Sequence, residues 1–163
     1  MKLACQESLV PGDSLQERME RLAEWGYEAI ELWGSGLKEH LAEVQHALQQ
    51  TAFKVSTLCA GYRGCLLDSN PQERALALHD LRDLLFMAGD LGAVGVITVP
   101  IFGGPRVPDL RPIATPEQIE TDLLCALLSD LAPTAEKAGT FILLEPLNRY
   151  ETHFLRRLEQ AGA

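Results

Sequence analysis

The sequence predicts an α/β fold built from about five β-α units, in a single domain covering residues 1–163. Short apolar runs that suit strands alternate with longer stretches whose apolar residues recur at helical spacing. The strands are expected to begin near residues 2, 28, 53, 94 and 140, each followed by a helix. Because helices separate consecutive strands, the sheet should be parallel with right-handed crossovers.

The first two units show this alternation clearly. Leu3 to Gln6 is the first expected strand, and Ser14 then opens a helix, with Glu17 three residues later completing a capping box. Gly26 is expected to end that helix. Ala29 to Trp33 is the second strand. The apolar stripe of the helix that follows is formed by Leu37, Leu41, Val44 and Leu48.

The third and fourth units carry strong helix and strand signals. Phe53 to Cys59 is the third expected strand. Asn70 can cap the next helix with Pro71 at its first position, and that helix should run to about Leu91. Val94 to Pro100 is the fourth strand, and its nearly continuous apolar character suits a strand buried on both faces of a parallel sheet.

The fifth unit follows a long irregular stretch from Phe102 to Ala114 that is rich in glycine and proline. This stretch comes after a strand, so it lies at the carboxyl edge of the sheet, where α/β proteins place their sites. A lid over a small ligand and a stiff structural connection both account for it. Thr115 then opens a helix, Thr140 to Glu145 is the fifth strand, and a last helix should begin near Thr152.

Two architectures fit this element order: an open doubly wound sheet and part of a closed barrel. No G-x-G-x-x-G follows the first strand, and no G-x-x-x-x-G-K-[ST] occurs anywhere. The nucleotide-binding versions of the open sheet are therefore disfavoured.

Net charge, the length of apolar runs and cysteine spacing count against several classes of protein. The net charge of −9 argues against a surface that neutralises nucleic-acid phosphates. No apolar run reaches about 18 residues, so we expect no membrane span, and the start of the chain lacks the apolar core of a secretory leader. The four cysteines show no C-x-x-C spacing, which predicts reduced thiols in a cytoplasmic protein, with Cys5 and Cys59 as small buried hydrophobes.

The strongest chemical signal is the segment from Leu143 to Glu151, in which an apolar strand ends in Glu145. A carboxylate at the carboxyl end of a barrel strand is typical of a catalytic or metal-binding position. From position alone, a solvated acid at a strand end explains Glu145 equally well.

This segment resembles the fifth-strand motif of the ketose 3-epimerases and related sugar isomerases of the xylose-isomerase-like TIM barrel superfamily. The segments Ala60 to Gly64, Ala93 to Pro100 and Ile30 to Trp33 are also similar to that group. The resemblance implies an α/β fold that is a partial (β/α) TIM barrel, with about five of the eight β-α units and therefore C-terminally incomplete. It also implies a metal-dependent sugar isomerase or epimerase that acts on a small sugar or sugar derivative.

The resemblance assigns roles to two carboxylates. Glu145 matches the glutamate that binds a divalent metal (manganese, magnesium or cobalt) and serves as one acid/base, and Glu151 matches a residue that holds the substrate. Such an ion would polarise the ketone and stabilise the enediolate formed when a proton leaves the neighbouring carbon. The family's other ligands, an Asp, a His and a second Glu, lie on later strands, which are not found here.

Weaker candidates lie at other strand ends. Glu31 ends the second strand, and Tyr62 and Arg63 follow the third, so all three could contact a sugar, while packing around Glu31 and solvation of Arg63 explain them as well. The histidines His40, His46 and His79 fall in or beside helices. We expect His153 to be a surface residue at the start of the last helix rather than a ligand.

Two alternatives compete with the epimerase interpretation. The chain could be a non-catalytic fragment that self-associates, because Ile30, Val55 and Val96 are expected to face an incompletely covered barrel interior and the first and fifth strands would have free edges. We therefore expect a homo-oligomer. An apurinic endonuclease shares the superfamily's barrel, but the charge of −9 and the absence of strand-end histidines on the early strands count against it.

Overall fold

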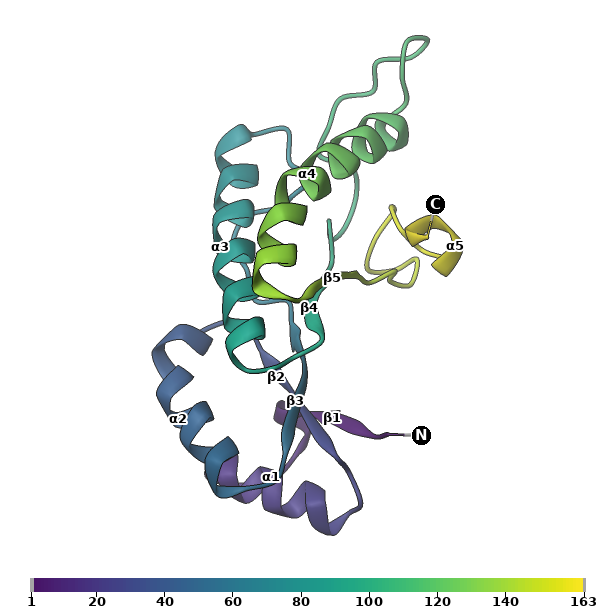
Figure 1. The fold of residues 1–163 in the computed structure, drawn as a ribbon. Coiled ribbons are helices and arrows are strands. Elements are labelled where there is room, and N and C mark those ends of the chain that lie inside the picture. Colours follow the sequence, from purple (N-terminus) through teal and green to yellow (C-terminus); the bar gives the residue numbers. More distant parts are fainter. Residues whose placement is uncertain (1, 163) are drawn as a thin grey trace.

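The computed structural model describes residues 2–162, which form one five-stranded parallel sheet with the long helices along one face (Figure 1). The strands are β1 (Ala4–Gln6), β2 (Ala29–Trp33), β3 (Lys54–Cys59), β4 (Gly95–Thr98) and β5 (Phe141–Leu144). The helices are the short 3-10 turn η1 (Glu7–Leu9), α1 (Leu15–Glu24), α2 (Leu37–Gln50), α3 (Pro71–Asp90), α4 (Pro116–Ala138) and α5 (Leu158–Ala161).

The spatial order of the strands is β1-β2-β3-β4-β5, the same as their order along the chain, and every neighbouring pair is parallel. A doubly wound sheet reverses its strand order at a switch point, whereas a barrel continues in one direction. The order therefore confirms the prediction of a partial barrel with five β-α units.

The helix starts follow the predicted signals with one difference. The Thr115 hydroxyl accepts from the Gln118 backbone N–H, and the Gln118 side chain accepts in return from the Thr115 backbone N–H, so this capping box is complete. At α1, Ser14 accepts from the Glu17 backbone N–H, but the Glu17 carboxylate accepts from the backbone of Asp13 instead of Ser14. The helix is thus capped as expected, without the reciprocal contact.

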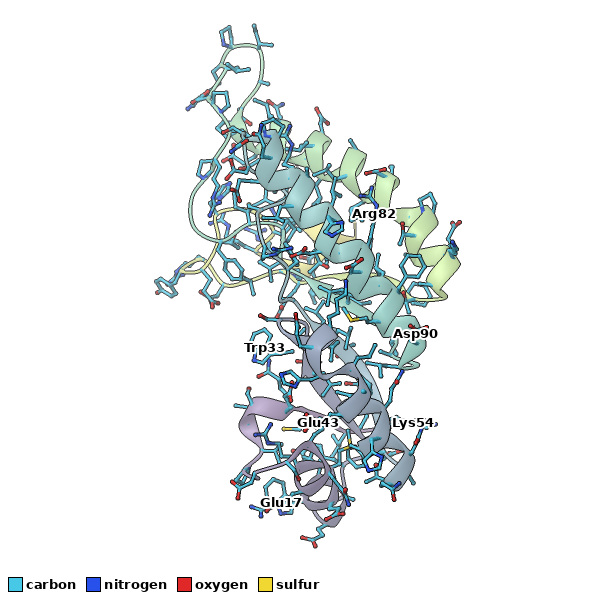
Figure 2. The ribbon with its side chains drawn as sticks, turned by 90° about the vertical axis from the view of Figure 1, so that its left-hand side faces the viewer. Glu17, Trp33, Glu43, Lys54, Arg82 and Asp90 are labelled. Atoms are coloured by element: carbon cyan, nitrogen blue, oxygen red, sulfur yellow. The ribbon has the colours of Figure 1, made fainter. Side chains whose placement is uncertain are left out.

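The two faces of the sheet have opposite characters. Figure 2 views the molecule from the helix side, where α2 and α3 lie in front of the sheet. The side chains that point toward these helices are fully or almost fully buried, and they include Ile30, Val55 and Val96. The expectation that these three residues face the barrel interior was wrong. Because successive strand residues point to opposite faces, the interior face carries their neighbours, such as Glu31.

The loops that follow β2 and β3 cross at two glycines. A Cβ atom on Gly34 would lie 2.0 Å from the Ala60 carbonyl oxygen, and one on Gly61 would lie 2.1 Å from the Ser35 nitrogen. Gly61 also has a φ of +90°, a backbone conformation that residues other than glycine rarely adopt. The two loops therefore pack backbone against backbone at the carboxyl end of the sheet.

The segments after β4 and β5 differ from the expected elements. The stretch from Phe102 to Ala114 extends as a finger beyond the start of α4 in Figure 1, and its residue Ile113 is 89% exposed. The last helix does not begin near Thr152. Thr152 is buried and pairs with Gly103 in an isolated parallel bridge, and α5 begins only at Leu158. Within residues 2–162, no helix is long and apolar enough to cross a membrane.

Candidate active site

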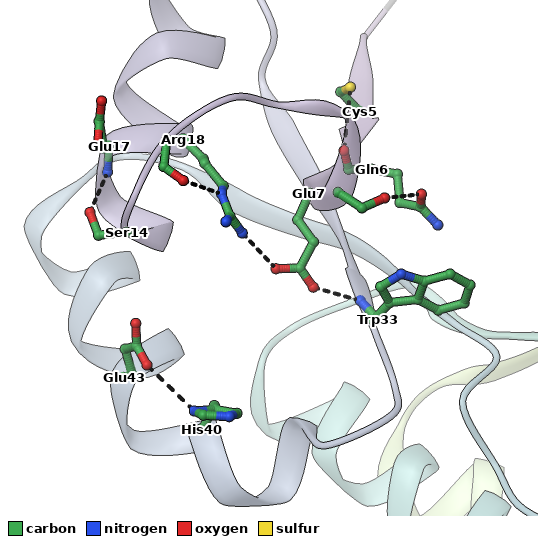
Figure 3. Close-up of polar contacts among 11 residues, drawn as sticks. Cys5, Gln6, Glu7, Ser14, Glu17, Arg18, Trp33, His40 and Glu43 are labelled. Carbon is green, nitrogen blue, oxygen red and sulfur yellow. Dashed lines mark hydrogen bonds and ion pairs between the residues drawn. The ribbon is translucent and has the colours of Figure 1, made fainter.

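The first strand end is organised by Glu7, directly after β1. Its carboxylate accepts a hydrogen bond from the backbone N–H of Trp33 at 2.9 Å and forms a 3.7 Å ion pair with Arg18 of α1 (Figure 3). Glu7 therefore fixes the end of β2 against the end of β1. The Trp33 indole points away from this ion pair and is partly exposed.

A polar cluster occupies the interior face of the sheet, with members from four strands or their ends. Thr57 on β3 donates to Glu31 on β2 at 2.7 Å. Burial, together with the charges of Glu31 and Glu145, raises the pKa of the Cys59 thiol to about 11, although a hydrogen bond with Gln6 acts in the opposite direction. The inner-face cluster consists of Gln6, Glu31, Thr57, Cys59 and Glu145.

Glu145 lies directly after β5, and its backbone N–H donates to the Thr98 carbonyl at 3.1 Å. The residue is exposed overall, yet the partial burial of its carboxyl is the largest cause of its raised pKa, followed by the charges of Glu31 and Glu151. Nearby like charges favour the protonated form, so a cation or a proton bound here would relieve the repulsion. The oxygen atoms of Glu145 are suited to a hard divalent ion.

The remaining predicted site residues are placed differently. Glu151 accepts from the Asn148 side chain, and both lie in the exposed turn after β5. Tyr62 donates its hydroxyl to the Val99 carbonyl, and burial raises the pKa of this phenol. Arg63 pairs with Asp80 of α3 at 2.8 Å, in the helix layer. Tyr62 and Arg63 therefore have protein partners and do not join the inner-face cluster.

Two sets of groups at or near the site were not predicted from the sequence. Thr57 and Cys59 belong to the inner-face cluster, and Cys59 is half-buried beside carboxylates instead of filling an apolar core. His153 is not a helix-start surface residue, because its Nε2 lies 2.6 Å from the carboxylate of Glu120, which is completely buried. Glu120 lies on the buried stripe of α4 with Leu124 and Leu131. An acidic residue at an otherwise apolar position of the helix was the sequence signal that could have indicated a buried, paired carboxylate.

The donor set for a metal is partial. Among the residues that the structure describes, no three His, Cys, Asp or Glu side chains are grouped as they are in a metal site. Of the early histidines, His40 pairs with Glu43 on the surface of α2. Glu145 can thus supply one carboxylate ligand, with Glu31 as its nearby acidic neighbour.

A parallel run of β-α units whose polar groups converge on the interior face defines a (β/α)-barrel protein. The family model described as "Xylose isomerase-like TIM barrel" matches residues 19–163. The chain belongs to this family, as the sequence motifs implied.

The chain is also similar to a known sugar epimerase and to two solved structures. It is 29% identical over 163 residues to 3-dehydro-D-guloside 4-epimerase of Escherichia coli (strain K12), covering 99% of this chain and 62% of that protein. The apo crystal structure of 3-keto-D-glucoside 4-epimerase, YcjR, from E. coli matches with a TM-score of 0.86 and 26% identity, again over 99% and 62% of the two chains. A structure of IolI with a bound zinc atom matches with a TM-score of 0.72 and 20% identity, over 99% and 56%. The chain therefore spans less than two thirds of the length of these proteins.

Proposed function

We propose that this chain supplies the metal-binding acid/base carboxylate, Glu145, of a sugar epimerase or isomerase that acts at a carbon next to a ketone. The observation that carries the proposal is the position of Glu145 after β5, beside Glu31, with a raised pKa. A base for a weakly acidic C–H works best when its pKa is closer to neutrality than that of an ordinary glutamate. The similarity to a protein with 4-epimerase activity on 3-keto sugars favours a 3-keto glycoside over a free ketose as the substrate class.

The chemistry assigned to the residues is a proton transfer. In such a substrate, C4 lies next to the C3 ketone, and the Glu145 carboxylate would take the C4 proton as the electron pair moves toward the ketone oxygen. Return of a proton to the opposite face from a second group completes the inversion. Glu151 would hold a sugar hydroxyl, and Glu31 would keep Glu145 prone to accept the proton. When bound, a divalent ion such as Mn²⁺, Mg²⁺ or Co²⁺ would lower the barrier by polarising the ketone.

The test is Mn²⁺ binding by the 163-residue chain, measured by electron paramagnetic resonance. We expect weak binding, because the described residues provide only a partial donor set, and we expect Glu145→Gln to abolish it. Glu43→Gln removes an exposed acid on α2 and is the matched control. Equal Mn²⁺ binding by wild type and Glu145→Gln would rule out the assignment.

Turnover gives a second readout. A preparation of verified mass should incorporate little or no solvent deuterium at C4 of a 3-keto glucoside, since further metal ligands are needed to stabilise the enediolate. Clear deuterium incorporation by the wild-type chain that persists in Glu145→Gln would exclude Glu145 as the base.

We also propose that the chain pairs with a second copy of itself. Trp33 and Phe141 expose large apolar surfaces, and β1 and β5 each pair with only one strand among the described residues. Unpaired strand edges and exposed apolar side chains both favour association.

A further inference from the structure

A buried contact joins α4 to the segment after β5, outside the inner-face cluster. Glu120 on α4 has 0% exposure. Its Oε2 lies 2.6 Å from His153 Nε2, and its Oε1 has no hydrogen-bond partner among the described residues. A buried carboxylate with so few partners is costly, so the contact with His153 is the main compensation for its burial.

The hydrogen-bond partners of His153 fix where its protons lie. The ring Nδ1 is 2.9 Å from the Gly103 carbonyl oxygen. A carbonyl can only accept, so Nδ1 carries a hydrogen atom. The short contact between Nε2 and Glu120 then holds a single proton, either on the ring as imidazolium or on the carboxyl group. In both forms the pair is neutral as a whole, which suits its burial.

The same histidine is part of a backbone ladder between two loops. The Gly103 N–H donates to the Glu151 carbonyl at 2.7 Å, and the His153 N–H donates to the Gly103 carbonyl at 3.0 Å. Gly103 has a φ of +78°, so it turns the chain at the start of the finger that follows β4. The contact between Glu120 and His153 therefore connects α4, the base of that finger and the segment that carries Glu151.

We propose that His153 and Glu120 are positioning residues that act through Gly103 to hold Glu151 at the carboxyl end of the sheet. The ring bond to Gly103 adds to the ladder that fixes the Glu151 backbone, and Glu120 keeps the ring in the orientation that allows this bond. The proposal rests on the proposed function only in taking Glu151 as a substrate contact. The connection itself requires neither substrate nor metal.

The experiment measures amide hydrogen exchange by NMR in the 163-residue chain and in three variants. Glu120→Leu removes the contact and leaves an apolar side chain in an apolar surrounding. Glu120→Gln keeps the contact, because its amide can donate to neutral Nε2 while Nδ1 still donates to Gly103. Glu136→Gln alters an exposed acid of the same helix and is the control.

In Glu120→Leu we expect faster exchange at the amides of Gly103 and His153, by about tenfold, as for the loss of one charge-assisted hydrogen bond. The slowly exchanging Nδ1–H resonance of His153 should disappear, and the amides of α3 should be unchanged. Glu120→Gln should restore both signals, which a residue that merely fills space would not do.

Three results would overturn the proposal: unchanged exchange at Gly103 and His153 in Glu120→Leu, a loss spread equally over α3, or a Glu120→Gln variant that behaves like Glu120→Leu. None of these measurements involves Mn²⁺ or a sugar. A failed metal-binding test at Glu145 and a failed test of the His153 contact can therefore be told apart.

Discussion

The face of the sheet that packs against α2 and α3 is apolar and buried, whereas the interior face is polar and partly exposed. On the face toward α2 and α3, the side chains of Leu58, Ile30 and Val96 are completely buried in a continuous apolar core. On the interior face, Glu31 and Cys59 form a polar cluster, and Phe141 is 65% exposed. Residues one position apart on a strand thus serve either packing or chemistry, so stability and reactivity should respond to different substitutions.

The largest expected contrast is in stability. Leu58→Ala should lower the free energy of unfolding by about 2–5 kcal/mol, because it leaves a cavity in the core between sheet and helices. Phe141→Ser on the interior face, measured at a protein concentration at which the chain is monomeric, should change it by no more than about 0.5 kcal/mol, since most of the ring is then in contact with solvent. Urea unfolding followed by circular dichroism measures both values. Equal losses in the two variants would show that both faces are packed alike.

The next contrast concerns association. Light scattering on a sample of confirmed mass should give a dimer or larger species, and Phe141→Ser should shift it toward the 17.9 kDa monomer. Ser129→Ala, on an exposed part of α4, is a suitable control. A wild-type chain that stays monomeric and unfolds cooperatively would show that five β-α units suffice without a partner.

The smallest expected effect is on the rate at which the Cys59 thiol is alkylated. With a pKa of about 11, it should be mostly protonated at pH 8, and its alkylation by iodoacetamide should accelerate as the pH rises toward 11. Glu31→Gln removes one of the charges that raise this pKa, so the rate at pH 8 should increase by roughly a few-fold. Mass spectrometry can follow Cys59 and the exposed Cys125 in the same sample. An unchanged ratio of the two rates would mean that Glu31 does not act on Cys59.

The sequence predicted the elements of the fold well, because their signals are local. The five strands begin close to the predicted positions, and the caps at Asn70 and Thr115 are present. Which face of a strand the helices cover is not a local property of the sequence, and this explains the wrong assignment of Ile30, Val55 and Val96. The pairing of β2 with β3 is irregular, because the register shifts between Ile30 and Leu32 of β2. No residue pattern in the sequence predicted this shift.

The candidate site was predictable where a motif marked Glu145 and where Glu31 was expected at the end of a strand. Glu145 follows β5 as its motif implied, whereas the contacts of Tyr62 with Val99 and of Arg63 with Asp80 depend on partners about 37 and 17 residues away. The pairing of His153 with Glu120 spans 33 residues and replaces the expected helix start. Long-range contacts of this kind leave no trace in spacing along the chain.

The crossing of Gly34 and Gly61 has a consequence for how such a site can diversify. Neither glycine can gain a side chain without displacing the other loop, since the nearest backbone atoms would lie about 2 Å from a new Cβ. Residues 34–36 and 60–64 should therefore be exchangeable only together. Replacing either loop alone with that of another barrel should disrupt the packing between the two loops. Replacing both together would place new loops at the carboxyl end of the sheet and leave the strands unchanged.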